Sequence, residues 1–188
     1  MPQMTHYPLI KALSFGRDAM LKPKSHDYSL ALLLSSILFI FGCSDNITPP
    51  IATMEPAPDF KMELFEGGDF QLSAQKGKVV VINFFASWCV SCGKETPVIE
   101  TISHKYSPQT VAFLAIAVDD TEIKAKAFMK KMGMTIPAGL DKTGKIKDDY
   151  GIYGMPTTFF IDKSGKVSYS HSGVVTEELL KHEIDKLL

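Results

Sequence analysis

A buried strand followed at once by a cysteine pair limits most strongly what this chain can fold into. Residues 79–85 read VVVINFF, an uncharged run of mostly β-forming residues that is typical of a central strand covered on both faces. The string WCVSC begins shortly afterwards at Trp88. A helix is expected from about Cys89 to Tyr106, interrupted or kinked at Pro97. This order places the cysteine pair at a helix N-terminus.

The position of the cysteine pair indicates redox chemistry. A helix N-terminus lowers the pKa of a thiol, because the helix dipole and the free N–H groups favour the thiolate. Cys89 is therefore expected to be the nucleophile, and Cys92, one turn further on, the thiol that resolves a mixed disulfide. The other interpretations of the pair are half of a zinc site, a structural disulfide and incidental thiols. A zinc site would need a second cysteine pair, which the sequence lacks.

The segments around this motif alternate between strand and helix patterns. The expected strands are 60–64, 70–72, 79–85, 111–118, 157–161 and 166–170, and the expected helices are 89–106, 121–132 and one that begins at the N-cap Thr176. In helix 121–132 the apolar positions at helical spacing, which we expect to be buried, are Ile123, Ala127, Phe128 and Met132. The order of elements implies an α/β sandwich around a mixed sheet.

An uncharged apolar stretch precedes the domain at residues 29–42 (SLALLLSSILFIFG). It is shorter than the roughly 20 residues that a membrane-spanning helix needs. With Lys22 and Lys24 before it, the stretch has the proportions of a secretory signal. Its end, Gly42-Cys43, resembles the site at which a bacterial lipoprotein is cleaved and lipidated, so Cys43 is the expected lipidation site. The alternatives are an uncleaved signal anchor and a buried core helix.

The chain is therefore expected to have three parts. Residues 1–43 are the expected signal and lipoprotein anchor segment, with Met20 as an alternative translation start. Residues 44–54 are the expected tether, since 44–58 contains four prolines and no periodicity. Residues 55–188 are the expected folded domain, held outside the cytoplasm at the membrane, in the bacterial periplasm or cell envelope.

Charge and cysteine content exclude two classes of protein. The chain has 20 Lys and Arg against 21 Asp and Glu, so no broad basic field points to nucleic acid. The three cysteines are too few for a small disulfide scaffold, and the unpaired one, Cys43, is explained by lipidation.

Three motifs of the domain resemble the TlpA/ResA type of thioredoxin-like protein: FFASWCVSCGKETP at 84–97, APDF at 57–60 and GMPTTFFID at 154–162. The resemblance covers about residues 55–188. It implies an α/β fold, a thioredoxin-like three-layer sandwich with a central mixed β-sheet and an added N-terminal β-hairpin. Two positions depart from the pattern: Ser91 stands where proline is common, and Gly93 where a basic residue is usual. The redox potential therefore does not carry over.

The resemblance also implies a function. Proteins of this type are anchored outside the cytoplasmic membrane and reduce disulfides in proteins, apocytochrome c among them. It implies that the chain takes protein disulfide substrates and a membrane-embedded electron donor, and that it works through its dithiol with no other cofactor and no metal. We expect a monomer.

Site residues follow from the same resemblance. Glu95, on the same helical face as Cys92, is the expected proton-transfer acid, with a solvated surface glutamate as the alternative. Pro156 is expected to follow a cis bond and to lie against the dithiol, with Met155 bordering the substrate groove. Trp88 is expected to cover one side of the dithiol, or else to be a structural aromatic.

Three further polar positions have two interpretations each. Asn83 stands where thioredoxins proper carry a buried acid, and we expect a hydrogen-bonded core residue there. Asp119-Asp120 ends a strand, where ligands often bind, but helix capping and turn formation are the favoured roles. His171 is expected to be a surface residue rather than a metal ligand.

Two other functions compete with disulfide reduction. Copper chaperones on the same fold use C-x-x-x-C with a distant histidine, and the spacing here is one residue shorter. A peroxidase of the peroxiredoxin type would carry T-x-x-C before the helix, which this sequence lacks.

Overall fold

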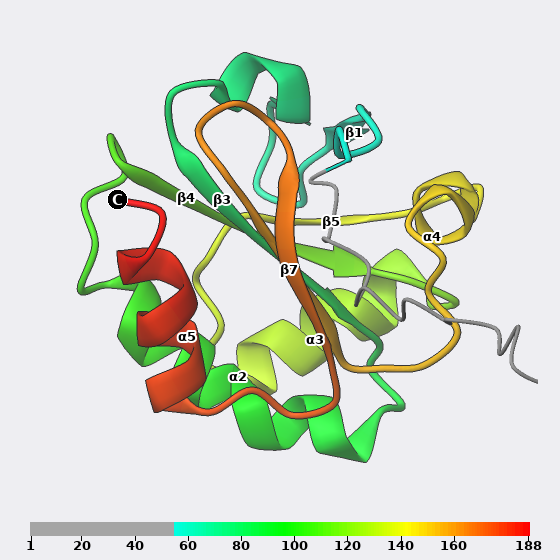
Figure 1. The fold of residues 1–188 in the computed structure, drawn as a ribbon. Coiled ribbons are helices and arrows are strands. Elements are labelled where there is room, and N and C mark those ends of the chain that lie inside the picture. The colour runs from blue at the N-terminus through cyan, green and yellow to red at the C-terminus, as the bar shows by residue number, and fades with distance from the viewer. Residues whose placement is uncertain (1–54) are drawn as a thin grey trace, which may run out of the picture. The chain divides into compact units, whose positions relative to one another are not determined.

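The computed structural model describes residues 55–188; the anchor and tether expected at 1–43 and 44–54 lie outside the described residues. A five-stranded mixed sheet forms the centre of the described part, with the order β5-β4-β3-β6-β7 (Figure 1). Pairing is parallel among β3, β4 and β5, and antiparallel from β3 to β6 and from β6 to β7. The strands are β3 (Val79–Phe85), β4 (Val111–Ala117), β5 (Ala138–Leu140), β6 (Thr157–Ile161) and β7 (Val167–Ser172).

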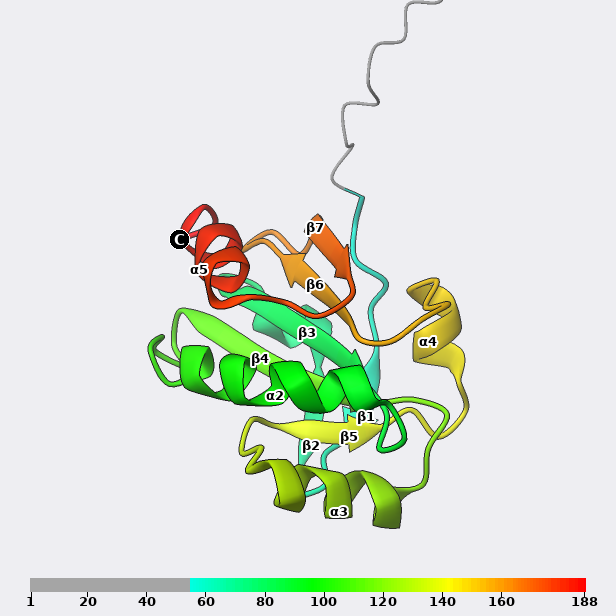
Figure 2. The same cartoon turned by 90° about the horizontal axis from the view of Figure 1, so that it is seen from below.

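Strand β3 is buried along its whole length because both faces of the sheet are covered. Val81 and Phe85 pack against the helices of one face, and Ile82 and Phe84 pack into the core of the other. Figure 2 shows α2 crossing in front of the sheet, with β1 and β2 behind it. The helices of the first face are α2 (Val90–Ser103), α3 (Glu122–Met132) and α5 (Glu177–Asp185). The second face is covered by β1 (Lys61–Glu63), β2 (Asp69–Gln71), the 3-10 helix η1 (Leu72–Gln75) and α4 (Lys145–Asp149).

This arrangement confirms the expected three-layer sandwich and its added hairpin. It also explains the composition of β3. A strand with solvent on one face would alternate between apolar and polar residues, whereas a strand between two cores is apolar at nearly every position.

Local sequence signals set the ends of the helices. The hydroxyl groups of Thr121 and Thr176 accept hydrogen bonds from the first turns of α3 and α5, so the N-cap expected at Thr176 is confirmed. Gly133 ends α3 in the left-handed conformation, with φ 66°. Helix α2 continues through Pro97 and ends three residues before the expected Tyr106.

The buried face of α3 differs from the expected one. Of the four expected positions, Phe128 and Met132 are half-buried, whereas Ile123 is 83% exposed and Ala127 is also exposed; the fully buried residues are Ala125 and Met129. The expected face was wrong at Ile123 and Ala127 because the helix carries more than one row of apolar residues at helical spacing. Only packing against the sheet selects the row that is buried.

Three short elements were not expected from the sequence. Strand β5 contains alanine and glycine rather than β-branched residues, α4 is five residues long, and η1 is a single 3-10 segment. None is long enough to show a periodic pattern, and each is held by contacts with other elements.

The hairpin packs on β5 through a close approach of two backbones. The N–H of Phe65 donates to the carbonyl of Ala138 at 2.8 Å, and Leu64 forms a bridge with Gly139. A Cβ atom at Gly139 would collide with the carbonyl oxygen of Glu63 and with a side-chain methyl group of the hairpin. Glycine at this position therefore lets the hairpin dock.

We predict that Gly139→Ala lowers the free energy of unfolding by about 1–3 kcal/mol, the usual effect of overpacking. Gly154→Ala is the matched control, because nothing lies within 4 Å of its Cβ position. Urea unfolding of the oxidised proteins measures both. Equal stability of the two variants would show that the hairpin moves away from β5 without loss.

Candidate active site

The cysteine pair lies at the N-terminus of α2 and forms a disulfide, with the two Cα atoms 5.4 Å apart. Cys89 is the N-cap residue, and its sulfur accepts a hydrogen bond from the N–H of Cys92 at 3.1 Å. The hydroxyl of Ser91 lies 3.4 Å from the same sulfur. Cys92 is 1% exposed and Cys89 6%, so Cys89 is the more accessible of the two.

The loop that precedes the disulfide is held by the end of β4. The carboxylate of Asp120 accepts hydrogen bonds from the N–H and the hydroxyl of Ser87, and another from the N–H of Thr121. The indole N–H of Trp88 donates to the carbonyl of Asp119 at 3.0 Å. Asp119 has φ 50°, the only positive value outside glycine among the described residues. The pair forms the bend before α3, as expected, but the expected capping role is wrong because Thr121 is the N-cap of that helix. The sequence did not show that the pair also positions Ser87 and Trp88.

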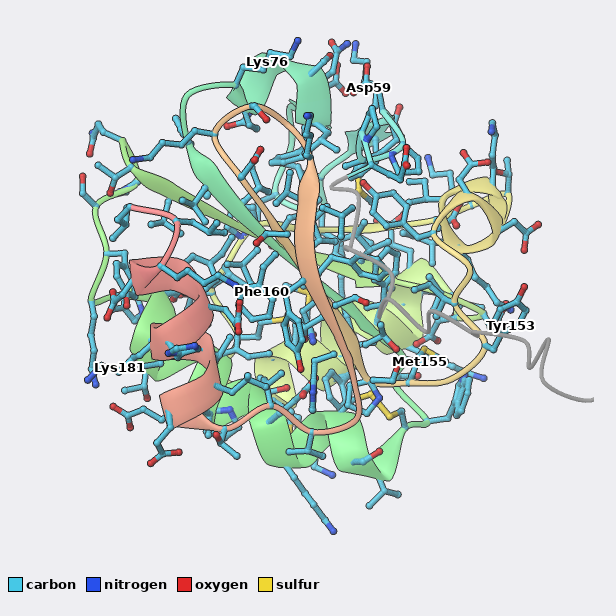
Figure 3. All side chains as sticks on the ribbon, viewed as in Figure 1. Asp59, Lys76, Tyr153, Met155, Phe160 and Lys181 are labelled. Carbon is cyan, nitrogen blue, oxygen red and sulfur yellow. A yellow bond between two sulfur atoms is a disulfide. The ribbon has the colours of Figure 1, made fainter. Side chains whose placement is uncertain are left out.

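Large exposed side chains lie next to the disulfide in the chain or line a cleft with its neighbour Trp88. Trp88 is 61% exposed, Val90 81% and Tyr153 fully exposed. A cleft of about 510 Å³ lies beside Trp88; its other lining residues are Asp119, Lys147, Asp148, Ile152, Tyr153, Gly154 and Met155. Figure 3 shows Tyr153 and Met155 on the same side of the molecule. Sequence reasoning missed Tyr153, although an aromatic residue two positions before the Met155-Pro156 motif was the available signal.

The Met155–Pro156 peptide bond is cis, as expected. The loop between β7 and α5 adjoins it, because the N–H of Gly173 donates to the carbonyl of Pro156 at 2.8 Å. The hydroxyl of Thr157 donates to the carbonyl of Gly154 at 2.8 Å and closes the turn on the other side. One of these hydrogen bonds holds the carbonyl of Pro156, and the other holds the turn from Gly154 to Thr157 that contains it.

Glu95 is 1% exposed, so the alternative of a solvated surface glutamate is wrong. One carboxylate oxygen accepts from the Asn83 side-chain amide at 2.8 Å, and the other accepts from the N–H of Val175 at 3.0 Å. Burial raises the pKa of Glu95 from 4.5 to about 7, although these two donors oppose the rise. Its pKa therefore lies where a carboxyl group can both take up and release protons at neutral pH.

Asn83 is the hydrogen-bonded core residue that the sequence indicates. Its amide also donates to the hydroxyl of Thr158 at 3.0 Å, and all three polar side chains of this cluster are buried. Thr158 stands opposite Asn83 in the antiparallel pairing of β3 and β6. The sequence did not single out Thr158, because a threonine in a strand is not in itself a signal.

Other expectations concern metals and membranes. His171 lies on β7, half-buried, with one ring nitrogen 3.3 Å from the carbonyl of Val174. Within residues 55–188, no three His, Cys, Asp or Glu side chains are grouped so that they could hold a metal ion. In the same range, no helix is both long and apolar enough to cross a membrane.

Known proteins share these features. Residues 52–188 match the sequence model of the Redoxin family. The thiol-disulfide oxidoreductase ResA of Bacillus thuringiensis subsp. konkukian (strain 97-27) is 37% identical over 131 residues, which cover 70% of this chain and 76% of that protein. ResA of Geobacillus thermodenitrificans (strain NG80-2) is 33% identical over 159 residues, covering 84% and 91%.

A solved structure supports the fold. A thiol:disulfide interchange protein of the thioredoxin family from Chlorobium tepidum TLS matches with a TM-score of 0.66 and 29% identity. The match covers 72% of this chain and 97% of that structure. The sandwich is therefore thioredoxin-like, as the sequence indicates.

The raised pKa of Glu95 predicts a pH-dependent stability. Between pH 4.5 and about 7 the folded protein keeps a proton that the unfolded chain has released, so the free energy of unfolding falls as pH rises through this window. Because a glutamine cannot ionise, the free energy of unfolding of Glu95→Gln does not fall in this way as pH rises. The stability of the variant relative to the parent should rise by about 3 kcal/mol between pH 4.5 and pH 8.

Urea unfolding of the oxidised proteins at several pH values tests this expectation. Glu100→Gln on the same helix is the control. Desolvation acts to raise the pKa of Glu100, but hydrogen bonds, chiefly from Thr135, outweigh it and hold the pKa below its usual value. Its carboxylate therefore stabilises the fold fully above pH 4.5 and loses this effect only as pH falls below 4.5. The stability of the control relative to the parent should be nearly constant between about pH 5 and pH 8. A pH-independent effect of Glu95→Gln would contradict the raised pKa.

Proposed function

The chain belongs to the Redoxin family and is a thiol-disulfide oxidoreductase, and we propose that it reduces disulfides in protein substrates through exchange at Cys89 and Cys92. The observation that carries the proposal is the disulfide at the N-terminus of α2, directly after an exposed tryptophan in the chain. The protein substrate and the electron donor both react with the disulfide or dithiol of Cys89 and Cys92.

Cys89 is the attacking thiol in this proposal. In the reduced protein its sulfur lies at the start of α2, where the N–H of Cys92 and the helix dipole favour the thiolate. The thiolate attacks one sulfur of the substrate disulfide, so that a bond forms from Cys89 to the substrate while the substrate S–S bond breaks. The sulfur that leaves takes up a proton.

Cys92 completes the exchange. It is nearly inaccessible, so it reacts with the mixed disulfide inside the protein rather than with a second substrate. Its thiol loses a proton and attacks the sulfur of Cys89, which forms the Cys89–Cys92 disulfide and releases the reduced substrate. The protein is oxidised by two electrons and the substrate is reduced by two.

Glu95 takes the proton from Cys92 in this scheme. It follows Cys92 by three residues in α2, and its pKa of about 7 lets it accept a proton at neutral pH and release it afterwards. A carboxylate with an unshifted pKa would be a weaker base. The burial that destabilises the ionised form of Glu95 therefore serves the reaction.

The substrate groove is formed by Trp88, Met155 and Pro156. An extended substrate segment can pair with the backbone before Pro156, which lacks an N–H. The cleft beside Trp88 takes a side chain of that segment, and Tyr153 borders it. Broad apolar contact of this kind suits unfolded polypeptides such as apocytochrome c.

The anchor and the direction of electron flow complete the proposal. The protein is held outside the cytoplasm, at the membrane, by lipid on Cys43. A donor embedded in that membrane reduces the Cys89–Cys92 disulfide after each turnover, and the domain acts as a monomer.

Trapping tests the proposed exchange. Cys92→Ser should accumulate a mixed disulfide between Cys89 and the substrate, because no internal thiol can resolve it. Cys89→Ser should trap nothing, and both variants should fall to the background rate of uncatalysed exchange. Non-reducing electrophoresis and mass spectrometry of the captured species identify the substrate. Trapping by Cys89→Ser instead would reverse the two roles.

Mass spectrometry of the membrane-extracted protein tests the anchor. We expect an N-terminus at Cys43 that carries acyl chains, because a charged segment, a short apolar core and Gly42 precede it. Cys43→Ser should remain unlipidated. An intact, unmodified segment 1–43 would show a signal anchor instead.

A further inference from the structure

The structure points to a second residue in the proton step that the proposed function assigns to Glu95. We propose that Asn83 is a positioning residue for Glu95, and that together with Thr158 it provides hydrogen-bond partners for both charge states of the buried carboxyl group. This inference rests on the proposed function. It concerns how a buried acid can change its charge without access to water.

The geometry fixes the carboxyl group from two sides. From the sheet, the Asn83 amide nitrogen lies 2.8 Å from one oxygen of Glu95, and from the β7–α5 loop the N–H of Val175 lies 3.0 Å from the other. The same amide nitrogen of Asn83 lies 3.0 Å from the hydroxyl oxygen of Thr158. The register of β3 and β6 places Asn83 and Thr158 directly opposite each other, so backbone pairing holds the second contact in place.

The groups around the Glu95 carboxyl group differ in whether they can donate or accept hydrogen bonds. The N–H of Val175 can only donate, so it serves the carboxylate but not an added O–H. A carboxylic acid needs an acceptor for its proton, and the Asn83 side chain carries a carbonyl oxygen as well as two N–H donors. Half a turn about the last bond of Asn83 presents that oxygen to Glu95. The hydroxyl of Thr158 can donate or accept, so it can follow the turn.

Other residue types at position 83 would not serve both states. A leucine would leave one oxygen of Glu95 without a partner, and an unpartnered buried polar atom is destabilising. An aspartate would place a second carboxyl group within hydrogen-bond distance, and the two would share a proton and titrate as a pair. An amide avoids both outcomes.

Among the described residues, no permanently charged side chain replaces Asn83 as the partner of the Glu95 carboxyl group. The causes of the raised pKa of Glu95 are burial, opposed by the Val175 and Asn83 donors, with no charged group among them. On the neighbouring strand β7, His171 stands opposite Thr158 and stacks on Tyr169. On α5, which shares a core with α2, the buried titratable group is Glu183. On α2 itself, the titratable groups facing this region are the thiols of Cys89 and Cys92 when reduced.

Carboxyl ¹³C NMR titration of Glu95 in the oxidised protein tests the proposal directly, without reference to activity. Asn83→Leu removes the partner of both charge states, but the hydrogen bond to the ionised carboxylate is the stronger of the two. The titration midpoint should therefore rise by about one pH unit, a tenfold change in proton affinity. Thr158→Val should raise the titration midpoint by less.

Thr96→Val is the matched control. It removes a buried hydroxyl on α2 that donates to the carbonyl of Cys92, and its titration midpoint should equal the parent's.

The pH dependence of the exchange rate provides the second readout. In Asn83→Leu the rate profile should move to higher pH by the same amount as the NMR midpoint. In the Glu95→Gln background, Asn83→Leu should produce no shift, because the carboxyl group that Asn83 contacts is gone and the cysteine thiols titrate alike in both proteins.

The outcomes separate the two hypotheses. Midpoints in Asn83→Leu and Thr158→Val that equal the parent's would overturn the role of Asn83, even if Glu95→Gln slows exchange. A Glu95→Gln rate profile identical to the parent's would instead remove Glu95 from the mechanism, while the NMR midpoints still report on Asn83. If Asn83→Leu does not fold, the comparison of Thr158→Val with Thr96→Val decides the question.

Discussion

The burial of β3 on both faces is the constraint on which the rest of the structure depends. The strand pairs with β4 along its full length on one side and with β6 on the other, and it separates two apolar cores. Its end therefore has a well-defined position. Because α2 begins only a few residues later, the disulfide of Cys89 and Cys92 is placed by the central, fully buried strand of the sheet.

The same burial explains the polar cluster in this core. A carboxyl group among apolar side chains loses its hydration, which raises the pKa of Glu95 to about 7 and makes its ionised form unfavourable. The fold limits this loss with three neighbours from separate elements: Asn83 from β3, Val175 from the β7–α5 loop, and Thr158 behind Asn83. The stability of the fold is thus lower at neutral pH than at the acid pH where Glu95 is protonated, and in the proposed mechanism this pKa lets Glu95 take up the proton of Cys92.

The surface around the disulfide combines fixed and open parts. The loop that carries Trp88 is held because Ser87 and Trp88 donate hydrogen bonds to Asp120 and Asp119, and the N–H of Gly173 donates to the carbonyl of Pro156. Between them, Tyr153 extends fully into solvent and borders a cleft. In the proposed function, a loop held by hydrogen bonds positions the sulfur atom of Cys89, and the exposed side chains beside it contact the protein substrate.

The sequence by itself determined those features of the structure that depend only on residues close together in the chain. The apolar run of β3, the cysteine pair at the start of α2 and the cap at Thr176 are each encoded within a few positions, because strand and helix periods and capping are local properties. The cis bond before Pro156 came from the resemblance of its motif to a known family. The Glu95 candidate also came from that resemblance, through its place three residues after Cys92.

Only the tertiary structure decided which groups surround these residues. The partners of Glu95 come from positions 12 and 80 residues away in the chain, and those of Asp120 from 33 residues away. The buried row of α3 and the short elements β5 and α4 were likewise selected by packing. No local pattern records such contacts, because they exist only once segments distant in sequence have been brought against the same sheet.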